Sequence, residues 1–195
     1  MKTLDFYFDY GSPAAYLAWT QLPALCAQTG ATLVNQPFLL GGAFQATGNR
    51  PPISVPAKGM YLFKDLTRYA KRYGVVFNMN PNFPINTLTF MRAAVGLQMR
   101  EPTRLEAFSA AVFKGIWVDG LNLNDPQIVG SMLAGAGFDP AAMMTMASDA
   151  AVKDELKART EAAVARGIFG APTFFVGDEM FWGQDRLDFV REALA

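Results

Sequence analysis

The sequence has no histidine and one cysteine among its 195 residues. The absence of histidine excludes His-based catalytic triads, His metal sites and an imidazole general base, which leaves catalysis to hydroxyls, carboxylates, Lys, Tyr or a cofactor. The lone Cys26 excludes an intramolecular disulfide and a Cys-x-x-Cys redox motif. Because it stands in the apolar run of residues 22–27, we expect Cys26 to be a buried packing residue, and we expect no metal site.

Net charge and long apolar runs are also missing. Seventeen Lys and Arg balance seventeen Asp and Glu, so no overall field would gather nucleic acid or an anionic membrane. The longest apolar stretches, such as residues 168–176, are shorter than the ~18 residues of a membrane span. Residues 1–5 run into a predicted strand without a basic or apolar signal region. We therefore expect a soluble, cytoplasmic protein.

The first forty residues predict a strand, a helix and a second strand. Residues 3–8 and 32–38 are rich in β-forming types, and residues 14–29 between them carry helix formers up to Gly30. Pro13 suits the first position of this helix. The order predicts a βαβ unit with a parallel strand pair.

Residues 39–166 have the periodicity of helices. One apolar face recurs at helical spacing, and it consists of Met60, Phe63, Leu66, Ala70 and Tyr73. Further helices are expected at residues 86–99, 102–118 and 149–166, the last one ended by Gly167. Asp125-Pro126 and Asp139-Pro140 each predict an N-cap followed by a first-turn proline.

The last thirty residues return to β character. Residues 173–176 and 179–182 flank Gly177-Asp178, a two-residue hairpin signal, and a final helix is expected from about residue 184 to 194. Strands at both ends with helices between them predict an α/β domain with a large helical insertion. The expected parts are a discontinuous domain of residues 1–38 and 167–195 and an insertion of residues 39–166.

Ser12-Pro13 follows the first predicted strand, where a thioredoxin-like chain carries its Cys-x-x-Cys. A serine before a proline at a helix start is an ordinary N-cap. The same place offers free N–H groups and positive potential, so the hydroxyl could also help to stabilise an anion such as a bound thiolate. The two interpretations are compatible.

Ala171-Pro172 enters the predicted strand at residue 173. The bond could be a trans strand boundary or a cis bond, which would turn the Ala171 backbone outward to pair with an extended, peptide-like ligand. Residues 48–52, Gly-Asn-Arg-Pro-Pro, form the one loop rich enough in turn residues to suggest a binding loop.

Six motifs resemble, in this order, those of the 2-hydroxychromene-2-carboxylate isomerases, which are close relatives of the kappa-class glutathione transferases. The resemblance covers nearly the whole chain and implies a thioredoxin fold with a helical insertion, a homodimer and a glutathione cofactor. The motifs are Phe8-Asp9-Tyr10-Gly11-Ser12-Pro13, Gly48-Asn49-Arg50-Pro51-Pro52, Pro56-Ala57-Lys58-Gly59-Met60-Tyr61, Phe83-Pro84-Ile85-Asn86-Thr87, Phe169-Gly170-Ala171-Pro172-Thr173 and Trp182-Gly183-Gln184-Asp185-Arg186-Leu187.

The resemblance also implies roles for single residues. Ser12 matches the serine that contacts the glutathione sulfur, and Ala171 with Pro172 matches the cis-proline backbone clamp. Asn49 and Lys58 match residues that hold the tripeptide, and a lysine suits a ligand carboxylate. Without the resemblance, Lys58 would be interpreted as a solvated charge.

Three further residues complete the implied site. Gln184 and Asp185 match the pair that receives the γ-glutamyl end, where a carboxylate suits an ammonium group. Asp185 could instead be an ordinary helix-start carboxylate. Asn86 could donate a hydrogen bond to a substrate carboxylate or carbonyl, or it could only cap the next helix.

The implied reaction interconverts 2-hydroxychromene-2-carboxylate and trans-o-hydroxybenzylidenepyruvate in the catabolism of aromatic compounds. A glutathione thiolate adds to the conjugated substrate, permits rotation about the former double bond and then leaves. Two alternatives stay open at this point. One is a kappa-like transferase that conjugates glutathione to electrophiles, and the other is a redox-inactive, thioredoxin-like peptide binder or chaperone.

Overall fold

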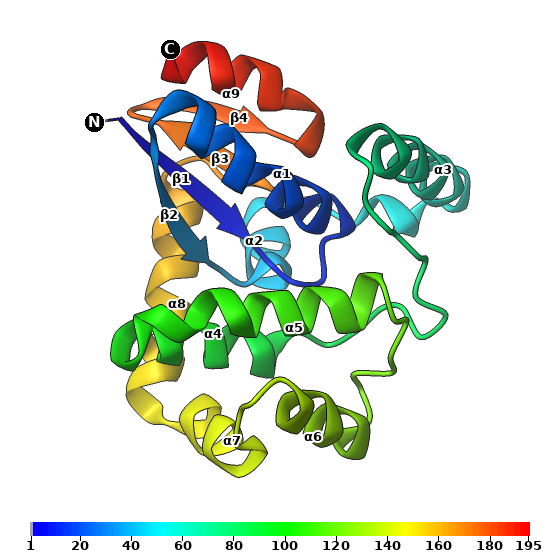
Figure 1. Cartoon of the computed structure of the whole chain (residues 1–195), viewed down its shortest axis with the longest axis vertical. Coiled ribbons are helices and arrows are strands. Elements are labelled where there is room, and N and C mark those ends of the chain that lie inside the picture. The colour runs from blue at the N-terminus through cyan, green and yellow to red at the C-terminus, as the bar shows by residue number, and fades with distance from the viewer. Residues whose placement is uncertain (1) are drawn as a thin grey trace.

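A computed structural model of the chain describes residues 2–195; Met1, with which the expected discontinuous domain begins, lies outside them. Its four-stranded sheet has the order β2-β1-β3-β4 and lies in the upper half of Figure 1. β1 (Thr3–Phe8) pairs in parallel with β2 (Thr32–Pro37). β3 (Thr173–Val176) pairs antiparallel with both β1 and β4 (Glu179–Trp182). The predicted parallel pair, the hairpin and the thioredoxin-like α/β fold are confirmed.

Helices surround this sheet and fill the lower half of the view, with α3 standing to one side near the start of α1 (Figure 1). The α-helices are α1 (Pro13–Thr29), α2 (Leu40–Thr47), α3 (Pro56–Tyr73), α4 (Leu88–Arg100), α5 (Leu105–Trp117), α6 (Pro126–Gly135), α7 (Pro140–Ser148), α8 (Ala150–Ala165) and α9 (Leu187–Leu194). Three short 3-10 helices join them, η1 (Pro52–Ser54), η2 (Pro102–Arg104) and η3 (Gln184–Arg186).

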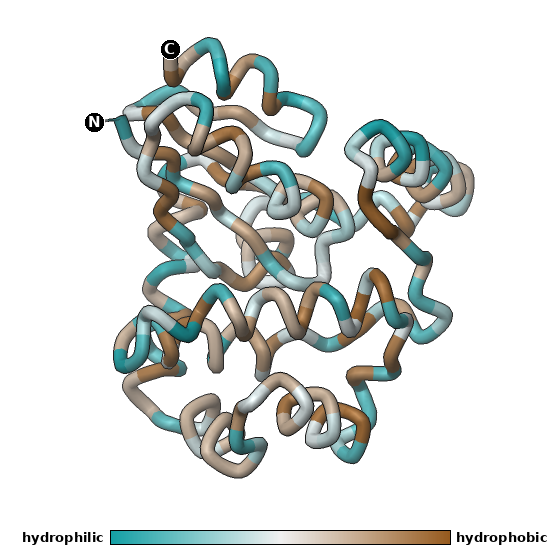
Figure 2. The backbone as a smooth tube through the Cα atoms, viewed as in Figure 1, coloured by the Kyte–Doolittle hydropathy of each residue, from teal (hydrophilic) through white to brown (hydrophobic). Residues whose placement is uncertain are grey.

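The two faces of β1 pack against different helices, because side chains alternate along a strand. Phe6 and Phe8 lie in the main core, which α1 and α9 share. Tyr7 faces the opposite way, toward a smaller cluster that includes Phe38, Phe175 and residues of α2 and α8. The tube in Figure 2 alternates between brown, hydrophobic residues and teal, hydrophilic residues along the helices, as expected for elements that bury one side. Both faces of the sheet are therefore covered.

Local signals in the sequence set several helix ends. The Asp125 side chain accepts a hydrogen bond from Gln127 N (2.8 Å), and Asp139 accepts one from Ala141 N (2.9 Å). Gly167 has a φ of 96° directly after the C-cap of α8. The two predicted N-caps and the predicted glycine stop are confirmed.

Other expectations need correction. The helix expected over residues 102–118 is split into η2 and α5, and the final helix begins as the 3-10 turn η3. Met60 is 73% exposed rather than part of the buried face of α3. Gly59, one residue earlier, occupies that face because the Cα of Ile53 lies so close that an added Cβ would be 3.2 Å away.

The division into residues 1–38 with 167–195 and an insertion of residues 39–166 stays a proposal. All four strands belong to the first part, yet the main core runs without interruption through residues of both parts. Within residues 2–195, no helix combines the length and the apolar character needed to cross a membrane.

We predict different effects on stability for two glycine-to-alanine substitutions in helices. In Gly96→Ala, the new Cβ would overlap Cγ of Met146 at the contact between α4 and α7, whereas Gly130 in α6 faces open space. Both variants gain about 1 kcal/mol of helix propensity, but overpacking costs Gly96→Ala about 1–3 kcal/mol. Denaturant unfolding should find Gly130→Ala more stable than wild type and Gly96→Ala less stable than Gly130→Ala. Equal stabilities would contradict the close packing of α4 on α7.

Candidate active site

Ser12 stands at the start of α1, in the turn that follows the central strand β1. Its backbone N–H donates to Asp9 O (3.0 Å), and its Oγ accepts from Ala15 N (3.1 Å), so it is the N-cap of the helix. Pro13 occupies the first helical position, where a missing N–H does no harm. The capping interpretation of Ser12 is confirmed.

The same hydroxyl reaches the second half of the expected site. Ser12 Oγ donates to the carbonyl oxygen of Ala171 (2.9 Å), 159 residues away in the chain. The Ala171-Pro172 bond is cis, and the Ser12 side chain is almost fully enclosed, with 5% of the residue exposed. The structure thus brings Ser12, Ala171 and Pro172 together.

The loop that contains the cis proline is held from several sides. Gly183 N donates to Pro172 O (3.0 Å), and Thr173 Oγ1 donates to Gly170 O (2.8 Å). Gly170 lies against the indole of Trp182, where an added Cβ would be 2.5 Å from Nε1. Only glycine fits this position without displacing the tryptophan.

Asn49 connects the predicted binding loop to the cis-proline loop. Its Nδ2 donates to Phe169 O (2.9 Å), and its Oδ1 accepts from Arg50 N (2.8 Å). The amide is therefore engaged within the protein, although Asn49 itself is exposed. Its placement beside the cis-proline loop agrees with the predicted site, and its contact with a tripeptide stays a prediction.

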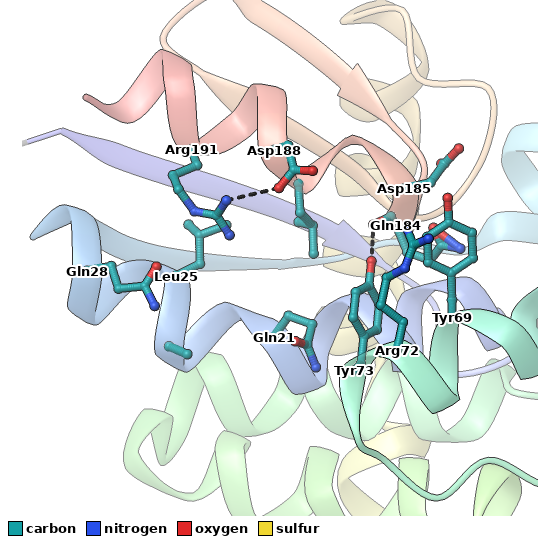
Figure 3. Close-up of a pocket in the computed structure, with 12 residues that line it drawn as sticks. Gln21, Leu25, Gln28, Tyr69, Arg72, Tyr73, Gln184, Asp185, Asp188 and Arg191 are labelled. Carbon is teal, nitrogen blue, oxygen red and sulfur yellow. Dashed lines mark hydrogen bonds and ion pairs between the residues drawn. The ribbon is translucent and has the colours of Figure 1, made fainter.

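Gln184 and Asp185 lie in η3 and line a cavity of about 230 Å³ between α1, α3 and α9 (Figure 3). Gln184 is 6% exposed, and its buried Oε1 has no hydrogen-bond partner among residues 2–195. Asp185 forms an ion pair with Arg186 (2.9 Å). Tyr73 donates from its hydroxyl to Gln184 O (2.9 Å), and burial raises the pKa of Tyr73 to about 12. Gln184 therefore offers an unused acceptor next to a carboxylate.

Lys58 and Asn86 are placed less directly. Lys58 is exposed in the first turn of α3 and lines a different depression, of about 390 Å³, with Tyr61 and Asp65. Asn86 Oδ1 accepts from Leu88 N (3.1 Å), so Asn86 serves the start of α4 as the capping interpretation expects. Neither residue forms a hydrogen bond with Ser12 in the part of the chain that the structure describes, and their ligand roles stay predictions.

Cys26 and Asp9 are two further ionisable groups, in α1 and in the turn before it. Cys26 is only partly buried in α1, not fully buried as expected, because it lies at the edge of the core; burial still raises the pKa of its thiol. Asp9 belongs to the same motif as Ser12 and is a fully enclosed carboxyl; desolvation raises its pKa, although the hydrogen bonds that it accepts act in the opposite direction. Among residues 2–195 there is no cluster of three or more potential metal ligands.

A serine at the helix start that donates to the residue before a cis proline, on a sheet of this order, defines a thioredoxin-like protein without redox cysteines. A family model described as the DSBA-like thioredoxin domain matches residues 3–195. The fold and the site therefore agree with a comparison that covers nearly the entire chain.

Individual relatives narrow this class. A 2-hydroxychromene-2-carboxylate isomerase of Sphingobium xenophagum is 36% identical over 99% of this chain and 98% of its own. A solved structure of such an isomerase superposes with a TM-score of 0.84 at 30% identity, covering 98% of this chain and 94% of that chain. A glutathione S-transferase kappa 1 of Rattus norvegicus is 27% identical over 97% of this chain and 89% of its own. The chain belongs to the 2-hydroxychromene-2-carboxylate isomerase family within the DSBA-like thioredoxin domains, and these relatives support an isomerase role.

Proposed function

We propose that the protein is a cytoplasmic, homodimeric, glutathione-dependent isomerase that interconverts 2-hydroxychromene-2-carboxylate and trans-o-hydroxybenzylidenepyruvate in the catabolism of aromatic compounds. The observation that carries this proposal is the hydrogen bond from Ser12 Oγ to Ala171 O, because it sets a hydroxyl beside the backbone that would hold a cysteinyl peptide. The named relatives support the reaction and its substrate.

The residues that the resemblance assigns to the site carry groups that suit glutathione. Gln184 Oε1 is a buried acceptor without a partner among residues 2–195, and the ammonium group of a γ-glutamyl end would supply the missing donor. The Asp185 carboxylate beside it would neutralise that charge. At the other end, Lys58 would pair with a carboxylate, and the N–H of Ala171, which donates to no group in residues 2–195, would pair with the peptide backbone. Asn49 would hold the tripeptide from the neighbouring loop.

Bound glutathione supplies a thiolate that adds reversibly to a conjugated double bond, which makes that bond rotatable. The protein has to favour the anion and orient it. The N-terminus of α1 contributes the positive end of the helix macrodipole, about half an elementary charge. Ser12 Oγ donates its hydrogen to the sulfur, and Asn86 donates from its amide to the carboxylate or carbonyl of the substrate.

The hydroxyl of Ser12 has a single hydrogen, and this limits its contribution. Donation to a thiolate replaces donation to Ala171 O. A hydrogen bond to a charged group contributes about 1.5–3 kcal/mol and a neutral one about 0.5–1.5 kcal/mol, so the net gain is about 1–1.5 kcal/mol. A ligand N–H that occupies the Ala171 carbonyl would favour this exchange, because it satisfies the acceptor that the hydroxyl leaves.

A kappa-like glutathione transferase is the second candidate, and the kappa relative at 27% identity favours it. It would use the same thiolate without expelling it at the end. The two functions therefore differ in whether glutathione is consumed.

The first test follows the spectrum of purified protein mixed with 2-hydroxychromene-2-carboxylate, with and without glutathione. We expect interconversion that requires glutathione and leaves the concentration of free thiol unchanged after many turnovers. Stoichiometric loss of thiol would identify the transferase. No reaction with glutathione present would refute the isomerase.

The second test is Ser12→Ala. We expect the glutathione-dependent rate to fall roughly five- to tenfold and the thiol pKa of bound glutathione to rise by about one unit, because the substitution removes a donor to the anion. Thiolate absorbance against pH measures this pKa.

Asp139→Ala is the control for the loss of a cap, since Asp139 caps α7 away from the site. It should lower the stability by about 1 kcal/mol and leave the rate per folded molecule unchanged. If Ser12→Ala behaves in the same way as this control, Ser12 is only a helix cap.

The third test asks whether Lys58 and Asp185 hold opposite ends of one ligand. Both residues are exposed, and exposed ion pairs contribute about 0.2–1 kcal/mol, so alanine at either position should weaken glutathione binding by up to about fivefold. Lys64→Ala, which changes another exposed lysine of α3, should leave the affinity for glutathione unchanged.

Calorimetry with γ-glutamylcysteine separates the two ends, because this dipeptide lacks the glycine carboxylate. Lys58→Ala should bind it as tightly as wild type does, while Asp185→Ala should bind it more weakly. Equal sensitivity of the dipeptide to both substitutions would refute the assignment of Lys58 to the glycine end.

A further inference from the structure

Asp9 is a buried carboxylate that the proposed reaction leaves without a role. It follows β1, lies three residues before Ser12 and is 2% exposed. Oδ1 accepts from Gly11 N (2.9 Å) and Thr87 Oγ1 (2.6 Å), and Oδ2 accepts from Leu40 N (2.9 Å). Within residues 2–195 Asp9 forms no ion pair with a Lys or Arg, so these three hydrogen-bond donors are the polar partners of its buried side chain.

The three donors come from three segments that are distant in the sequence. Gly11 belongs to the turn that carries Ser12, Leu40 begins α2, and Thr87 stands at the start of α4. The backbone carbonyl of Asp9 accepts in addition from Ser12 N (3.0 Å). One residue therefore fixes the turn through both its side chain and its main chain.

The partners of Asp9 are arranged for a group that only accepts hydrogen bonds. A backbone N–H points at each carboxylate oxygen, so an amide would bring its own NH₂ group against one of these donors. Thr87 stands at the N-cap of α4, where its side chain makes no capping hydrogen bond, and its hydroxyl donates to Asp9. The N-cap of α2, Leu39, has no side-chain oxygen, and Asp9 supplies one from the turn after β1.

We propose that Asp9 is a positioning residue that holds the Ser12 turn in register with the start of α4. This inference rests on the proposed function, in which Ser12 meets the glutathione sulfur and Asn86, the neighbour of Thr87, meets the substrate. Asp9 joins the two segments that carry these residues. Its loss should therefore disturb the orientation of the thiolate and of the substrate together.

The test compares Asp9→Asn and Thr87→Val with Thr160→Val. Thr160 is a buried threonine whose Oγ1 accepts from Leu39 N (3.0 Å), so the control removes a hydrogen bond at the same start of α2 without touching the Ser12 turn. We expect both Asp9→Asn and Thr87→Val to lower kcat on the order of tenfold, to raise KM for the substrate and to raise the thiol pKa of bound glutathione. Thr160→Val should lower the stability but leave the kinetics and the thiol pKa unchanged. Thr87→Ser should retain wild-type kinetics because it keeps the hydroxyl.

Amide hydrogen exchange at Ser12 and Ala15 gives a readout that needs no activity. Both N–H groups should exchange faster in Asp9→Asn than in Thr160→Val, since both hydrogen bonds depend on the turn. If Asp9→Asn does not fold, Thr87→Val decides the question.

The outcomes separate the two proposals. In one outcome the wild type shows no glutathione-dependent reaction, while the amides of Ser12 and Ala15 exchange faster in Asp9→Asn. That result would refute the isomerase and retain the positioning role. In the other outcome the wild type is active, but Asp9→Asn and Thr87→Val match Thr160→Val in kinetics, in the thiol pKa of bound glutathione and in amide exchange. That result would overturn the positioning role.

Discussion

The hydrogen bond between Ser12 Oγ and Ala171 O is the interaction on which the site depends. It exists because the central strands place the two ends of the chain side by side, with Tyr7 opposite Thr173 in the register of β1 and β3. Ser12 follows Tyr7 by five residues, and Ala171 precedes Thr173 by two. The sheet therefore determines which loops meet, and the loops then need only local hydrogen bonds to hold their shape.

Features with local causes were predictable from the sequence. Proline after Ser12, Asp125 or Asp139 marks a helix start, because the cap satisfies a nearby N–H and the ring fits the first turn. The hairpin at Gly177 follows from a glycine with a φ of 60° between two short apolar runs. Each of these signals acts within a few residues, so no knowledge of the tertiary fold was required.

Features that depend on distant contacts were not predictable in this way. Asp9 meets Leu40 and Thr87, which are 31 and 78 residues away, and no spacing in the sequence indicates that these groups share one carboxylate. Gln184 was assigned by resemblance, but its unsatisfied Oε1 emerges only from the packing around η3. The exposure of Met60 was not predictable from helical periodicity alone, because Gly59 rather than Met60 packs on the backbone of Ile53.

The electrostatics of the site suit a reversible addition. The hydrogen bonds and ion pairs of Ser12 and Ala171 within residues 2–195 include no Lys or Arg, and Asp9 places a buried carboxylate nearby. The groups that Ser12 and the start of α1 offer the proposed thiolate are therefore a hydroxyl and a helix terminus, which lower a thiol pKa less than an adjacent cation does. The nucleophilicity of a thiolate falls as its pKa falls, whereas its ability to leave improves. A catalyst that has to add a thiolate and then expel it needs both properties, and moderate stabilisation of the anion preserves both.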